Sequence, residues 1–177
     1  MNHHAHLTSF CLFLTVLLAA AAVPAQTVFF DPAVTSPLAK EFTVVLAVAG
    51  PDPVMGVDLV FTYDPTVVRL DAVDAGTFFT GSGFDYQFWN DPYVPAGTVH
   101  VSAAQLGSAA PATGSLAVFR FYALDVGVSP LYFLSLTVRD GANQDMQAEH
   151  STGDRIIIDE AIPTDDLSFG HVKALYR

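Results

Sequence analysis

Apolar and polar residues alternate along much of the chain, and the clearest run is residues 56–70, GVDLVFTYDPTVVRL. One face of this run would carry Val57, Leu59, Phe61 and Tyr63, and the other face Asp58, Val60 and Thr62. A period of two is typical of a strand with one buried face. Asp64-Pro65 ends the strand, because proline has no amide hydrogen and fixes its own φ. A second short strand is predicted directly after this turn.

The same pattern predicts a series of short strands along the chain. They are expected at residues 26–32, 41–48, 57–63, 67–70, 84–89, 97–104, 115–127, 131–138 and 153–159. Gly, Pro and Asp lie between them, residues 71–84 are expected to form a loop, and no segment before residue 165 has useful helical periodicity. This pattern indicates an all-β fold, an antiparallel β-sandwich of about nine strands.

The chain begins with a segment that we expect to be removed. Residues 10–23 form an apolar run of signal-peptide length, and small residues precede Gln26. We therefore predict a signal peptide at residues 1–25, cleaved after Ala25, so that Gln26, free or cyclised, begins the mature chain. The run is short for a stable membrane span, but the leading segment lacks Lys and Arg, so a retained anchor is the alternative. The mature protein would be secreted or extracellular, in solution or at the cell surface.

Residues 26–160 are expected to form one domain, followed by a tail at residues 161–177. Ser168 could cap a short C-terminal helix, with acidic residues near the start of that helix and basic residues near its end. Such a helix could dock on the sandwich, or the tail could serve as a sorting or attachment peptide.

Charge and cysteine content exclude several classes of function. The chain has 7 Lys and Arg against 18 Asp and Glu, a formal net charge of −11. Nucleic acids and anionic lipids require clustered basic residues, so we expect neither as a partner. The single cysteine, Cys11, lies in the predicted signal peptide. A mature chain without it has no disulfide, and its stability must come from its core.

The sequence contains no motif that supports catalysis or a cofactor. His100, His150 and His171 are not accompanied by a nucleophile elbow or a His-x-x-x-His metal pair. His100 lies in an alternating strand, where a surface or packed position is favoured over a catalytic base. Residues 140–145, DGANQD, do not have the spacing of an EF-hand and favour a hairpin turn. We therefore expect neither catalysis nor a bound metal or cofactor.

The order of strands and turns resembles the cohesin domain, the receptor module of cellulosome-type scaffolds. The matching pieces are VFF, EFTVVLAV, MGVDLVFTYDPTVVRL, GTVHVSAA, TGSLAVFRFYAL and TGDRIIID, between residues 28 and 159. The Tyr63-Asp64-Pro65 turn and the strand at residues 114–121 are the most specific of them. The resemblance implies a nine-stranded jelly-roll sandwich. It also implies a non-catalytic module that usually binds a dockerin, a small calcium-loaded helical protein, in an extracellular assembly related to polysaccharides.

The resemblance also indicates where a partner would bind. In cohesins, the acidic residue at the position of Asp58 contacts hydroxyl side chains of the dockerin. The family position two residues earlier, often Asn, is Gly56, and the acidic position near the end of the later contact strand corresponds to Gln105. The predicted partner-binding residues are Asp58, Val60, Thr62 and Gln105. An exposed aspartate on a solvated strand face is the alternative interpretation of Asp58.

An aromatic cluster supports a second possible function, binding of a polysaccharide. Phe84, Tyr86, Phe88, Trp89 and Tyr93 lie within ten residues, and sugars stack on exposed rings. Alternation assigns Phe84, Tyr86 and Phe88 to one face, which we expect to be core. Trp89 and Tyr93 are then the candidate carbohydrate-binding residues, although packing in the core or a loop is the favoured interpretation of these rings.

Overall fold

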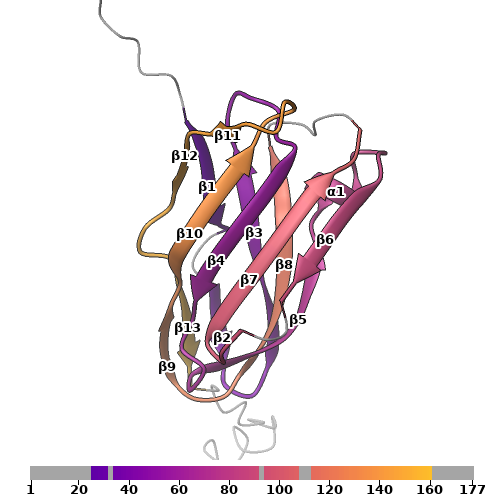
Figure 1. Cartoon of the computed structure of the whole chain (residues 1–177). Coiled ribbons are helices and arrows are strands. Elements are labelled where there is room, and N and C mark those ends of the chain that lie inside the picture. The colour runs from indigo at the N-terminus through magenta and orange to yellow at the C-terminus, as the bar shows by residue number, and fades with distance from the viewer. Residues whose placement is uncertain (1–24, 32–33, 92–93, 108–112, 161–177) are drawn as a thin grey trace, which may run out of the picture.

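The computed structural model describes residues 25–31, 34–91, 94–107 and 113–160, which form a sandwich of two β-sheets (Figure 1). One layer has the strand order β12-β1-β3-β8-β5, and the other has the order β11-β10-β4-β7-β6. A three-stranded sheet, β2-β13-β9, lies at the lower end in Figure 1. Most of the predicted signal peptide and the tail at 161–177 lie outside the described residues.

The strand bounds are as follows. The first layer contains β12 (Ala148–His150), β1 (Gln26–Phe30), β3 (Glu41–Ala49), β8 (Gly114–Ala123) and β5 (Val68–Ala75). The second layer contains β11 (Asp145–Met146), β10 (Tyr132–Arg139), β4 (Gly56–Thr62), β7 (Thr98–Gln105) and β6 (Tyr86–Asn90). The small sheet contains β2 (Val34–Pro37), β13 (Arg155–Asp159) and β9 (Gly127–Pro130).

The predicted all-β sandwich is confirmed, and each predicted strand overlaps an observed one. The short strands β2, β9, β11 and β12 were not predicted, because two to four residues cannot display a period. The pairs β1–β12 and β2–β13 are parallel, so the sandwich is not antiparallel throughout. No helix in the described part of the chain is long and apolar enough to cross a membrane.

Strand β4 occupies the middle of the second layer, between β10 and β7. The predicted alternation is confirmed there, since Val57, Leu59 and Phe61 are buried while Asp58 is exposed. Apolar side chains on the inner faces of both layers form one core. At its centre, the ring of Phe61 lies 5.0 Å from that of Phe30 on β1 and 5.1 Å from that of Phe119 on β8. These edge-to-face contacts join the two layers.

The segment at residues 71–84 differs from the predicted loop. Strand β5 continues to Ala75, and a one-turn helix, α1 (Thr77–Thr80), follows it. A register shift between Leu70 and Ala72 breaks the alternation, which is why the sequence pattern hides the second half of the strand. Gly76 then packs against β8 so closely that a Cβ there would collide with the carbonyl oxygen of Ser115.

The Tyr63-Asp64-Pro65 turn is held by its own aspartate. Asp64 Oδ1 accepts hydrogen bonds from the backbone N–H of Thr66, at 2.8 Å, and from the Thr66 hydroxyl, at 2.6 Å. The backbone N–H of Asp64 donates to the hydroxyl of buried Ser129, at 2.8 Å, which ties the turn to β9. The turn therefore fixes where β4 ends and β5 begins.

Substitution of Thr66 by Ala is expected to raise the pKa of Asp64 toward its ordinary value. The Thr66 hydroxyl, and then the Thr66 backbone N–H, hold the pKa of Asp64 below that value. A carboxyl whose pKa is lowered by folding stabilises the fold above its unfolded pKa, and this contribution is lost as the pH falls through the folded pKa. The variant should therefore lose less stability on acidification. An NMR titration of the Asp64 carboxyl carbon measures the shift, and an unchanged pKa would contradict the hydroxyl contact.

Candidate functional site

The outer face of the layer β11-β10-β4-β7-β6 carries the predicted partner-binding strand. Cross-strand pairs in a sheet share a face, so the registers identify which residues surround Asp58. Ser102 on β7 and Thr137 on β10 lie directly opposite Asp58. The face comprises chiefly Asp58, Val60, Thr62, Trp89, His100, Ser102, Ala104, Thr137 and Arg139. Most of these residues are small or polar, with Trp89 as an exposed aromatic exception, whereas those of the inner face are large and apolar.

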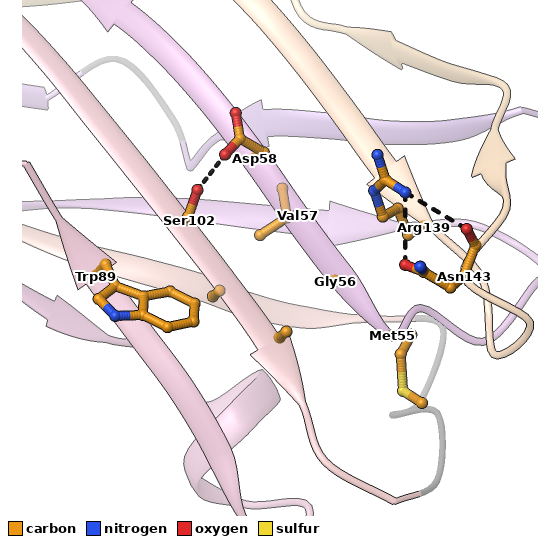
Figure 2. Close-up of a pocket in the computed structure, with 10 residues that line it drawn as sticks. Met55, Gly56, Val57, Asp58, Trp89, Ser102, Arg139 and Asn143 are labelled. Atoms are coloured by element: carbon orange, nitrogen blue, oxygen red, sulfur yellow. Dashed lines mark hydrogen bonds between the residues drawn. The ribbon is translucent and has the colours of Figure 1, made fainter.

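Asp58 is accessible and is held in place by β7. Its side chain is 52% exposed, and its Oδ2 accepts a hydrogen bond from the Ser102 hydroxyl (Figure 2). His100 Nε2 lies 3.3 Å from the same oxygen, and His100 Nδ1 lies 4.0 Å from Asp91 Oδ2. These contacts fix the carboxylate on the face, where it can accept hydrogen bonds from hydroxyl or N–H groups.

A shallow groove of about 200 Å³ lies beside Asp58. Figure 2 shows Trp89 and Arg139 on opposite sides of Gly56, with Asp58 toward one end and Met55 toward the other. Arg139 is directed by its own contacts: its guanidinium donates to the backbone oxygen of Asn143 at 3.4 Å and pairs with Asp145 at 3.3 Å. The groove therefore has an aromatic wall and a cationic wall.

The structure places three of the four predicted partner-binding residues together. Asp58, Val60 and Thr62 share the outer face, with Val60 and Thr62 half-buried by their neighbours. Gln105 does not lie on this face, so the prediction that it contacts the partner was wrong. Its side chain is 2% exposed and points inward, on the same side of β7 as Val101. Positions 101 and 105 are four apart in one strand, so alternation alone places Gln105 on the same face as Val101.

Substitution of Gln105 by Met is expected to keep or raise the free energy of unfolding. Neither polar atom of its buried amide has a hydrogen-bond partner among the described residues, and such groups cost about 1–3 kcal/mol. Methionine has a similar length and no such cost. Urea unfolding of the two proteins measures the difference, with Gln105→Glu as a control expected to be clearly less stable because it buries a charge. A loss above about 1 kcal/mol in the Met variant would mean that the amide is hydrogen-bonded.

The aromatic residues around β6 depart partly from expectation. Trp89 is 53% exposed on the outer face, which overturns the favoured interpretation that it packs in the core or a loop, whereas Tyr93 lies outside the described residues. Phe88 packs against the core, but Phe84 and Tyr86 are exposed, so their assignment to the core was wrong. The reason is that β6 is the edge strand of its sheet, and the start of an edge strand lies at the margin of the core.

Sequence reasoning missed Ser102, Arg139 and the contact of His100 with Asp58. These residues lie far from Asp58 in sequence, and only the pairing register brings them together. A register of β4 against β7 would have found Ser102, but the sequence alone does not provide one. Within the described ranges, no three or more His, Cys, Asp or Glu side chains form a group that could hold a metal ion.

Comparisons with known proteins agree on one family. The family model described as "Cohesin domain" matches residues 32–158. The non-cellulosomal cohesin of the archaeon Archaeoglobus fulgidus has a TM-score of 0.61 at 18% identity, over 84% of this chain and 97% of that one. The seventh ScaB type I cohesin of Pseudobacteroides cellulosolvens has a TM-score of 0.66 at 18% identity, over 80% and 96%.

A third similar structure is a complex. The sixth cohesin of Acetivibrio cellulolyticus scaffoldin B, solved with a Cel5 dockerin mutant, has a TM-score of 0.65 at 15% identity, over 76% of this chain and 99% of that one. No curated protein matches the chain. At these identities the structural matches show the fold, and the family model extends over most of the sandwich. The chain belongs to the cohesin family and is a non-catalytic binding module.

Proposed function

We propose that the chain is a secreted cohesin module that binds a dockerin-like protein through the outer face of β11-β10-β4-β7-β6. Family membership supports this proposal, as does the dockerin complex of the Acetivibrio cohesin. The assembly would be extracellular and related to polysaccharides. The net charge of −11 is compatible with a soluble extracellular module.

The observation that carries the proposal is the placement of Asp58. Its carboxylate lies mid-strand on an accessible sheet face, and both of its contacts within the described structure are made through Oδ2. Oδ1 can therefore accept a hydrogen bond from a hydroxyl or N–H group of the partner. Val60 and Thr62 continue the same face without adding a charge, so a partner can cover it without desolvating many ions.

A titration of the chain with a panel of calcium-loaded dockerins tests the proposal. We expect saturable binding of at least one dockerin, and loss of that binding when calcium is chelated, because the helical partner needs its metal. Ser102→Arg places a large cation at the centre of the face and should abolish the interaction. Thr43→Arg makes the same kind of change on β3, in the other layer, and should have no effect. Absence of binding by every dockerin, or equal loss in both variants, would contradict the proposal.

Secretion would follow from cleavage after Ala25. The start of β1 at Gln26 supports a domain that begins there. The Gln26 side chain is buried and its amide donates to the backbone oxygen of Asp52, a bond that cyclisation would remove. We therefore expect an uncyclised Gln26 at the N-terminus. Mass spectrometry of secreted protein tests this, and a mature chain that retains residues 10–23 would indicate an anchor instead.

A polysaccharide is the second candidate ligand, because the exposed indole of Trp89 could stack on a sugar ring. Retention of the chain on an insoluble polysaccharide, lost in Trp89→Ala, would favour this function. Dockerin binding without such retention would favour the first.

A further inference from the structure

We propose that the groove between Trp89 and Arg139 receives one large apolar side chain of the protein partner, and that Gly56 and Ala104 determine this specificity. The inference rests on the proposed function, because the side chain belongs to the same dockerin-like protein that contacts Asp58. It adds a second recognition element, of different chemistry, to the Asp58 contact.

The groove exists because its floor consists of residues with almost no side chain. Gly56 on β4 lies directly opposite Ala104 on β7, so two very small residues adjoin on the outer face. A Cβ at Gly56 would lie 3.2 Å from the Ala103 backbone oxygen and 3.7 Å from the Ala104 Cβ. Any larger residue at either position would therefore occupy the space that now forms the groove. In the order β10-β4-β7-β6, the strands that carry Arg139 and Trp89 lie three strand spacings apart, about 14 Å, which leaves room for a side chain to enter between them.

The chemistry of the lining selects an apolar occupant. The Trp89 indole forms one wall, and the floor presents glycine and alanine with the flexible thioether of Met55 at one end. Two polar groups at the rim already have partners within the chain: Ser102 donates to Asp58, and Arg139 pairs with Asp145. An occupant with its own charge would have to compete with these pairs, whereas an apolar side chain would only displace water.

The position of Asp58 makes the groove continuous with the proposed contact surface. The carboxylate lines the groove itself, so a partner that bonds to Asp58 must cover the adjoining space. An exposed tryptophan in such a position is typical of the residues that dominate protein interfaces once water is excluded. One inserted side chain would bury the indole that is half exposed in the free protein.

The test uses Trp89 as its own probe, because it is the single tryptophan of the chain. A dockerin from the panel that binds and lacks tryptophan is titrated while fluorescence and calorimetric heat are recorded. We expect a blue shift of the emission and at least threefold weaker quenching by acrylamide at saturation. Ala104→Leu, which fills the groove, should weaken binding at least tenfold. Ala47→Leu, on β3 in the other layer, is the matched control and should bind like the wild type.

The outcomes separate this inference from the proposed function. Calorimetric binding without a change in Trp89 emission or quenching would overturn the inference and leave the proposed function standing. Wild-type affinity of a folded Ala104→Leu would do the same. If Ala104→Leu fails to fold, Trp89→Ala replaces it, and its wild-type affinity would likewise overturn the inference. If no dockerin binds, the proposed function fails and the inference with it.

Discussion

Replacement of Phe61 by alanine is expected to lower the free energy of unfolding by about 3–5 kcal/mol. The side chain is 0% exposed, and its ring contacts Phe30 and Phe119, both of which belong to the other layer. Truncation would remove the contacts that join the layers and leave a cavity that the surrounding strands can only partly fill. Because domains of this kind have about 5–15 kcal/mol of stability, the loss is a large fraction.

Urea unfolding of the two proteins measures this effect. Thr43→Ala, at an exposed position of β3, is the control and should change the stability by less than about 1 kcal/mol. A loss below about 1.5 kcal/mol in Phe61→Ala would contradict the assignment of this ring to the centre of the core. A smaller fraction of the Phe61→Ala protein should be folded, but the folded fraction should bind the dockerin with wild-type affinity, since Phe61 faces away from the binding surface.

Replacement of Asp58 by alanine is expected to weaken dockerin binding by roughly ten- to a hundredfold. The carboxylate would lose its charge-assisted hydrogen bonds to the partner, which contribute on the order of 1.5–3 kcal/mol. The fold should lose little, within about 0.5 kcal/mol, because the side chain is half exposed and its contacts with Ser102 and His100 lie at the surface. The variant thus separates binding from stability.

Asp74→Ala is the matched control for this substitution. Asp74 is 59% exposed on β5, in the other layer, and pairs with Arg120 at 3.4 Å. The Asp74→Ala variant should bind the dockerin with wild-type affinity. A sharp drop in the melting temperature of Asp58→Ala would show that Asp58 is structural, and an unchanged affinity would place the contact surface elsewhere.

The alternation of β4 was sufficient to predict which of its residues are buried and which are exposed. A period of two is an intrinsic property of the strand, so the sequence contains it in full. Strand β5 was only half predicted, because the register shift between Leu70 and Ala72 reverses the pattern within the strand. The family correspondence places Gln105 on the outer face, but the alternation of β7 places it on the buried face with Val101, and the alternation is the correct guide.

The surroundings of Asp58 could not be predicted, since they depend on pairings between distant strands. Ser102 and His100 reach the carboxylate only through the β4–β7 register, and Arg139 reaches the groove through the β4–β10 register. The groove could not be predicted either. It exists because Gly56 and Ala104 lie opposite each other on neighbouring strands, and the sequence of either strand alone does not reveal this pairing.

The central claim is that the partner binds the outer face of β11-β10-β4-β7-β6. The most direct test is an NMR map of backbone and side-chain chemical shifts for the chain alone and at saturation with a dockerin. The account predicts that the perturbations centre on Asp58, Ser102 and Trp89, with little change at Asp74 and Arg120 in the other layer. Perturbations centred on the outer face of β3, β8 and β5, with Asp58 unaffected, would contradict it.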